Sequence, residues 1–96
     1  MILSAELSLY PLAEDYIPAI DAFIDALRAN PALVVVSNAM STQIRGEHDA
    51  VMNAVSETLR ASAERFGMQV LVCKFIPAAL AIDRQAAEVE RPASQP

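Results

Sequence analysis

The order in which the hydrophobic pattern changes its period is the feature that most constrains this chain. Apolar and polar residues alternate over Ile2–Leu9, which is typical of a β-strand with one buried face. Over Tyr16–Leu27 the apolar residues recur at helical spacing instead, and the pair Asn30-Pro31 ends that segment. The short runs Leu33–Asn38 and Ser41–Gly46 then predict two strands joined by a turn. The first half of the chain therefore predicts a strand, a helix and a pair of strands.

A second helix and a final strand complete the pattern. The helix follows Gly46, has an apolar side from Val51 to Phe66, and ends at Gly67, where a left-handed C-cap is expected. Met68–Ile76 is predicted to be the fourth strand. The order β-α-β-β-α-β predicts an α+β, ferredoxin-like fold. Two right-handed crossovers then place both helices on one face of a four-stranded antiparallel sheet.

Local signals predict where the folded part begins and ends. Asp15 is a suitable N-cap for the first helix, and Pro18 fits only within its opening turn. A chain of 96 residues has room for one hydrophobic core, so we assign residues 1–78 to a single ferredoxin-like domain. Residues 79–96 are expected to form a short alanine-rich helix over Ala79–Glu90 and then a disordered end.

Two of the predicted strands are too apolar for a sheet with one face in water. Three apolar residues are consecutive in both Val34–Val36 and Val70–Val72, and 54% of all residues are hydrophobic. The helices cover only one face of the sheet. We therefore expect a homo-oligomer, a dimer or a tetramer, that assembles through the open sheet face. The alternative is that short strands rich in β-branched residues are simply apolar.

The charge balance excludes several classes of partner. The net charge of −5 argues against nucleic-acid binding, because neutralising phosphates requires a basic patch. No apolar run approaches the roughly 20 residues that span a bilayer, and the N-terminus lacks a signal-peptide pattern. The single cysteine, Cys73, fits a reducing compartment. We expect a cytoplasmic protein without nucleic-acid binding or membrane insertion, whose acidity tolerates a cationic small molecule.

Signatures of catalysis and metal binding are missing from the sequence. With only two glycines, the chain has no phosphate-binding loop. His48, the single histidine, is expected to face solvent at a helix start, and Cys73 is expected to be a buried, inert thiol. Glu14-Asp15 and the pair Glu47 and Asp49 are also placed at helix starts, where capping explains them. We therefore predict no catalytic residue, no metal and no cofactor, and expect that the protein is not an enzyme.

One polar segment, Ser37–Gln43, has the composition of a ligand site. Its hydroxyl and amide groups are neutral donors and acceptors that suit the edge of a heterocycle. Met40 adds a polarizable surface for a flat ring. The alternative is an ordinary hairpin turn, in which Asn, Ser and Thr are frequent. The chemistry of the segment alone leaves both interpretations open.

The joint spacing of several short motifs resembles the YkoF-like thiamine-binding family. The resemblance spans about residues 3–80 and is found in Ser8-Leu9-Tyr10-Pro11-Leu12, Asn38-Ala39-Met40-Ser41-Thr42-Gln43-Ile44, Gly46-Glu47, Asp49, Val51-Met52 and Phe75-Ile76-Pro77. It implies non-catalytic binding of thiamine or its hydroxymethylpyrimidine moiety, in precursor salvage or transport. It also implies that separate subunits assemble with their sheets face to face.

The resemblance assigns ligand contacts to Tyr10, Asn38, Met40, Ser41, Thr42 and Gln43. Tyr10 would pack against a ring, Met40 would touch the aminopyrimidine face, and the polar residues would donate or accept hydrogen bonds. Strand alternation places Ser41 and Gln43 on the face opposite Thr42. Thr42 is therefore the favoured polar contact, with Asn38 or Gln43 as the second.

Three further residues have weaker assignments. Glu6 or Glu47 would complement the thiazolium charge, or either is merely solvated. Gly46 is expected to be structural and to permit the turn from strand to helix. The competing hypothesis for the whole chain is an oligomeric structural or interaction protein without a small-molecule function.

Overall fold

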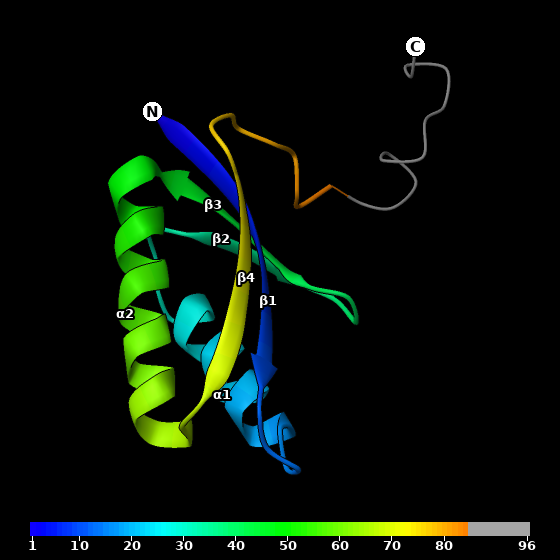
Figure 1. Ribbon diagram of the computed structural model, residues 1–96. Coiled ribbons are helices and arrows are strands. Elements are labelled where there is room, and N and C mark those ends of the chain that lie inside the picture. Colours follow the sequence, from blue (N-terminus) through cyan, green and yellow to red (C-terminus); the bar gives the residue numbers. More distant parts are fainter. Residues whose placement is uncertain (85–96) are drawn as a thin grey trace.

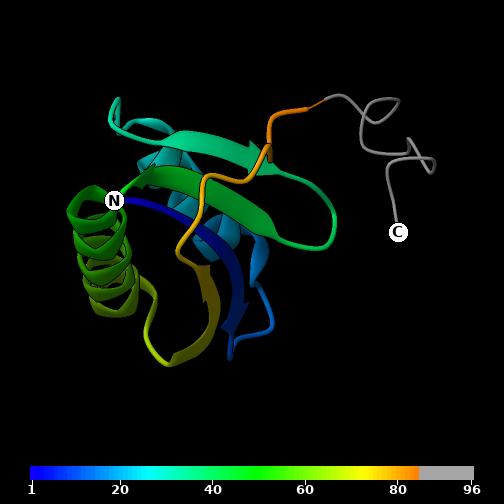
Figure 2. The same cartoon turned by 90° about the horizontal axis from the view of Figure 1, so that it is seen from above.

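The computed structural model describes residues 1–84 and has the predicted order of elements (Figure 1). They are β1 (Ile2–Pro11), α1 (Ile17–Arg28), β2 (Val34–Ser37), β3 (Thr42–Glu47), α2 (His48–Phe66) and β4 (Gln69–Ile76). The strands form one antiparallel sheet in the order β2-β3-β1-β4. Both helices lie on the same face of the sheet (Figures 1 and 2). The predicted ferredoxin-like α+β fold is confirmed.

The hydrophobic core lies between the sheet and the two helices. Leu7 of β1, Leu27 of α1, Ile44 of β3 and Val51 of α2 are each at most 1% exposed. These four side chains come from four different elements, so their burial joins both layers of the fold. Truncating a fully buried leucine of this kind costs about 2–5 kcal/mol of folding free energy.

The sequence predicts residues that begin α1 and end α2, and the structure supports only some of them. Asp15 is not the N-cap of α1, because the cap position is Tyr16 and no side chain bonds the free amides there. Pro18 does lie in the first turn, where its missing amide has no helical partner to lose. Gly67 follows α2 with φ = 87°, a backbone angle that glycine adopts without a steric penalty.

Gly46 is structural, but the reason differs from the expected turn. Its φ is not positive. A Cβ at this position would instead lie 2.8 Å from the carbonyl oxygen of Ala32 and 3.1 Å from a methyl group of Leu33. Glycine is therefore needed because the chain that enters β2 passes directly over β3.

The helix predicted over Ala79–Glu90 is absent from its described part, residues 79–84, and its remainder lies outside the described residues, as does the predicted disordered end. The Ala78 carbonyl and the Leu80 amide are both hydrogen bonded to the Ser4 hydroxyl, so neither serves a helix. The start of this segment is bound to the sheet instead. Within residues 1–84, no helix is both long and apolar enough to cross a membrane.

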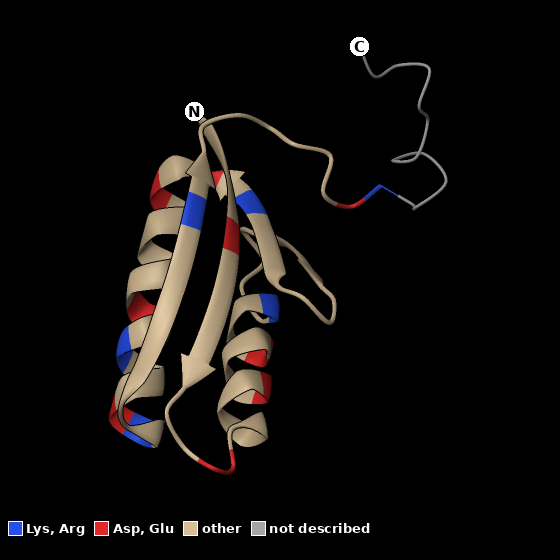
Figure 3. Cartoon of the chain, turned by 45° about the vertical axis from the view of Figure 1, so that its right-hand side comes forward, with Lys and Arg blue, Asp and Glu red and all other residues tan. Residues whose placement is uncertain are grey.

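The two faces of the sheet differ in the exposure of their apolar side chains. Val35 and Leu71 pack against the core, whereas Val70 and Val72 are on the opposite face and are 48% and 45% exposed. Charged residues are sparse on the strands and lie mainly on the helices (Figure 3). The open face of the isolated chain is therefore partly apolar.

Candidate ligand-binding site

The candidate site is a notch in the sheet that arises because β1 is longer than β3. β1 pairs with β3 only as far as Leu7, which is opposite Thr42. On its other side β1 continues to pair with β4 as far as Pro11. The segment Ser8–Pro11 consequently has no strand partner on the β3 side. The hairpin between β2 and β3 diverges from β1 at this point (Figure 1).

The register of the strands determines which backbone groups face the notch. The amide of His48 donates to the carbonyl of Met1 on the β3 side, and the amide of Leu12 donates to the carbonyl of Met68 on the β4 side. Because the peptide groups of a strand alternate in direction, the odd-numbered residues of β1 face β3. The N–H and C=O of Leu9 therefore both point into the notch.

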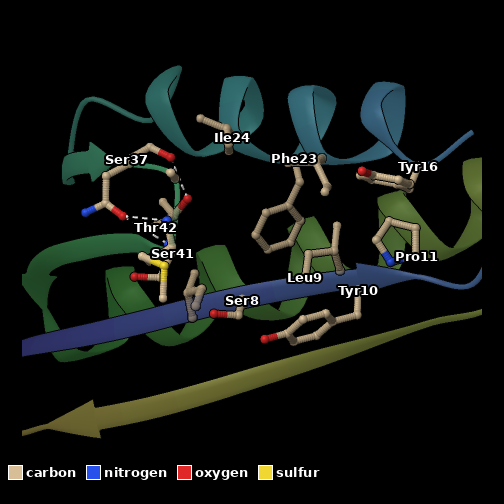
Figure 4. Close-up of a pocket in the computed structure, with 15 residues that line it drawn as sticks. Ser8, Leu9, Tyr10, Pro11, Tyr16, Phe23, Ile24, Ser37, Ser41 and Thr42 are labelled. Carbon is tan, nitrogen blue, oxygen red and sulfur yellow. Dashed lines mark hydrogen bonds between the residues drawn. The ribbon is translucent and has the colours of Figure 1, made fainter.

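A cavity of about 420 Å³ occupies the notch between β1, α1 and the β2–β3 hairpin. This volume is in the range of small-molecule sites. Leu9 and Phe23 project toward each other across the gap between β1 and α1, and Tyr16 lies at the open end (Figure 4). Tyr10 projects from the opposite side of β1 and contributes to the rim. The walls are thus mostly aliphatic and aromatic.

The polar groups of the cavity come from the hairpin. Thr42 is 5% exposed, and its hydroxyl lies 2.9 Å from that of Ser37. Either hydroxyl can donate in this pair, so one proton and several lone pairs are left for other partners. Thr42 is the only one of the six predicted contacts that is buried.

The turn at the tip of the hairpin is held by Asn38. Its side-chain oxygen accepts hydrogen bonds from the backbone amides of Met40 at 2.8 Å and Ser41 at 3.1 Å. The backbone amide of Asn38 donates to the Ser41 carbonyl at 3.0 Å. Met40 lines the cavity but is 86% exposed. The alternative interpretation of this segment as an ordinary turn is therefore correct for the Asn38 oxygen, while the same turn forms one wall of the cavity.

Ser41 and Gln43 take part in a second polar group on the open face. The Ser41 hydroxyl donates to Glu6 at 2.9 Å, and the Gln43 side-chain amide donates to the Ser41 hydroxyl at 3.4 Å. Lys74 lies 3.5 Å from the other oxygen of Glu6. Gln43 does not line the notch cavity, whereas Ser41 lines it and also contacts this group. The predicted separation from Thr42 therefore holds for Gln43, whereas Ser41 lines the same cavity as Thr42.

The two acidic candidates are at different ends of the sheet. Glu6 accepts a hydrogen bond from Ser41, which is a residue of the cavity wall. Glu47 is at the far end of β3, where it forms an exposed ion pair with the N-terminal amine at 3.1 Å. Of the two, only Glu6 is near the cavity.

The structure thus brings Tyr10, Asn38, Met40, Ser41 and Thr42 around one cavity and leaves Gln43 out of it. Sequence reasoning missed Ser8, Tyr16 and Phe23 as wall residues, because their patterns are those of ordinary strand and helix positions, and it included Ser37 only as part of the polar segment. It also missed the backbone of Leu9. The one available signal was the unequal length of the first and third predicted strands.

The reactive side chains outside the notch are unremarkable. His48 is exposed at the start of α2, as predicted, with Nδ1 2.9 Å from Asp49. Cys73 is only partly buried, and this burial raises the pKa of its thiol. Among residues 1–84, no three His, Cys, Asp or Glu side chains are grouped so that they could hold a metal ion.

The fold and the notch together define a small ferredoxin-like domain with an apolar cavity where the pairing of β1 with β3 ends. Comparison with known proteins gives this class a family. Residues 2–76 match the YKOF-related Family, so the chain belongs to that family. Among curated proteins, no significant relative was found.

Solved structures from three different organisms have the same fold. A Streptococcus pneumoniae protein is 23% identical and superposes with a TM-score of 0.78, over 95% of this chain and 100% of its own. A proposed thiamine biosynthesis/salvage protein from Thermotoga maritima is 17% identical, with a TM-score of 0.78 and coverage of 93% and 99%. A Methanocaldococcus jannaschii protein is 20% identical, with a TM-score of 0.71 and coverage of 92% and 91%. At these identities the similarity establishes the fold.

Proposed function

We propose that this protein binds thiamine or its hydroxymethylpyrimidine moiety without catalysing a reaction, and acts in the salvage or transport of thiamine precursors. Family membership and the Thermotoga maritima neighbour support a thiamine-related role. The observation that most supports binding is the notch, where the unpaired backbone edge of Leu9 and the buried Thr42 line one largely apolar cavity.

The backbone edge at Leu9 is complementary to an aminopyrimidine. The heterocycle presents an amino donor beside a ring-nitrogen acceptor, and a strand residue presents a C=O acceptor beside an N–H donor. In the proposed pose the amino group donates to the Leu9 carbonyl, and the Leu9 amide donates to the ring nitrogen. The ligand thus completes the pairing that β3 interrupts after Leu7.

The side chains of the cavity suit the remainder of the ring. Phe23 and Leu9 provide flat or apolar surfaces on the side of α1, and Met40 can close over the opposite face. Thr42 supplies a hydroxyl contact, which a buried polar group of the ligand would otherwise lack. Asn38 contributes through the turn that it holds.

The charge of the site favours thiamine over its pyrophosphate. Glu6 is the acidic group beside the cavity wall, and the whole chain has a net charge of −5. A thiazolium cation is attracted by such a field and a pyrophosphate is repelled by it.

Thermal unfolding with separate additions of thiamine, hydroxymethylpyrimidine and thiamine pyrophosphate tests the proposal. A ligand at about 100 times its dissociation constant adds about 2.7 kcal/mol of stability. For a domain of this size each kcal/mol raises Tm by roughly 4–8 °C. We expect a rise with thiamine or the pyrimidine and a smaller one with the pyrophosphate. An unchanged Tm with all three compounds would contradict the proposal.

We also propose that copies of the chain self-associate through the open sheet face, as a dimer or a tetramer. Tyr10, Val70 and Val72 on that face are 54%, 48% and 45% exposed, which is high for neighbouring apolar side chains of a small domain. If the thermal assay finds no ligand, an interaction protein that uses this face becomes the better description.

A further inference from the structure

Residues 77–84 cross the open face of the sheet after β4 ends, on the side opposite the helices (Figures 1 and 2). Their first attachment is Ser4, whose hydroxyl donates to the Ala78 carbonyl at 2.7 Å and accepts from the Leu80 amide at 3.0 Å. Ser4 belongs to the open face of β1, yet it is only 2% exposed. A small polar side chain on an uncovered sheet face would be exposed to solvent, so the burial of Ser4 is caused by residues 77–84, which cover it.

The second attachment is Arg45 of β3. Its guanidinium donates to the Leu80 carbonyl at 2.7 Å and forms a two-pronged ion pair with Asp83, at 3.0 and 3.5 Å. The fork of an arginine side chain suits such a bidentate contact. Both backbone polar groups of Leu80 are therefore bound by sheet side chains, the amide by Ser4 and the carbonyl by Arg45.

The space under the segment is incompletely filled. A hollow of about 230 Å³ remains there, lined by Ser4, Ala5, Glu6, Gln43, Lys74, Ile76, Leu80 and Ile82. Leu80 is still 40% exposed. The contact of residues 77–84 with the sheet thus depends more on its polar attachments than on close apolar packing. Such a contact opens more readily than the core does.

The segment divides the open face into two parts. The part around Ser4 and Arg45 is covered, whereas the part that contains Tyr10, Val70 and Val72 is bare. We infer that residues 77–84 act as an intramolecular cover that withholds the Ser4–Arg45 part of the open face from self-association. The occupant of that part is this chain's own segment, and a second copy meets only the bare part. This inference rests on the proposed self-association and does not depend on the ligand.

Hydrogen exchange at the Leu80 amide, combined with sedimentation, tests the cover on the full chain. In the wild type we expect that amide to be protected by about tenfold or more relative to an unstructured peptide. In the double variant Ser4→Ala/Asp83→Ala we expect the protection to be lost. The dimer dissociation constant should then fall by about threefold or more, because the released segment no longer keeps a second copy off that part of the sheet.

The single variant Asp83→Ala serves if Ser4→Ala impairs folding, since Asp83 is exposed and lies outside the sheet. It should give smaller changes in the same directions. Asp25→Ala removes the same charge from the exposed side of α1 and should change neither measurement. An unprotected Leu80 amide in the wild type would overturn the cover itself. Loss of protection without tighter association would overturn its role in withholding the face.

Discussion

At the scale of single residues, the hydroxyl of Thr42 is the sharpest test of the notch. Thr42→Val keeps the shape and the β-branch but leaves a bound ligand without a polar partner. We expect binding of thiamine or hydroxymethylpyrimidine to weaken by about 1–3 kcal/mol, which raises the dissociation constant roughly 5- to 150-fold in isothermal titration calorimetry. Thr58→Val is the matched control, because Thr58 is on α2 away from the notch. Equal affinity of both variants would remove Thr42 from the site.

Gly46 illustrates a residue whose role only the neighbouring chain reveals. Gly46→Ala would bring a methyl group to within 2.8 Å of the Ala32 carbonyl, which is backbone and cannot move aside cheaply. We expect a loss of about 1–3 kcal/mol in the free energy of unfolding, measured with urea. In Gly67→Ala the added methyl meets nothing within 4 Å, so any loss there comes from the backbone angle alone. Unchanged stability of Gly46→Ala would show that the loop over β3 can yield.

At the scale of elements, the segment after β4 depends on the ion pair between Arg45 and Asp83. Hydrogen bonding to the Arg45 guanidinium holds the pKa of the Asp83 carboxyl below its ordinary value of 3.8. The ionised carboxylate of Asp83 therefore stabilises the folded state at any pH above that ordinary value. This stabilisation is lost as the pH falls through the lowered pKa.

An NMR titration of the Asp83 carboxyl tests this attachment directly. In Arg45→Gln we expect its midpoint to rise toward the ordinary value, because the main cause of the shift is removed. A midpoint for Asp83 that is the same in both proteins would mean that the ion pair does not form in solution.

At the scale of the whole molecule, the proposed self-association depends on the bare part of the open face. Val72→Lys places a charge in that part, so we expect the dimer or tetramer to dissociate in sedimentation experiments. The stability of the monomer should change by only about 0.5 kcal/mol, because the side chain is exposed. Met52→Lys, at a 40% exposed position of α2, is the control and should leave assembly unchanged. Persistent assembly of Val72→Lys would place the interface elsewhere.

Sequence periodicity alone determined the order of the elements, because burial on one face imposes a period of two on β1 and 3.6 on the helices. It also separated Thr42 from Gln43, since alternation is a local property of a strand. It could not give the notch, which exists because β1 pairs further with β4 than with β3. Nor could it give the cover, which joins Ser4 to residues more than seventy positions away. Such long-range pairings are settled by packing, which leaves no mark on the local pattern of either partner.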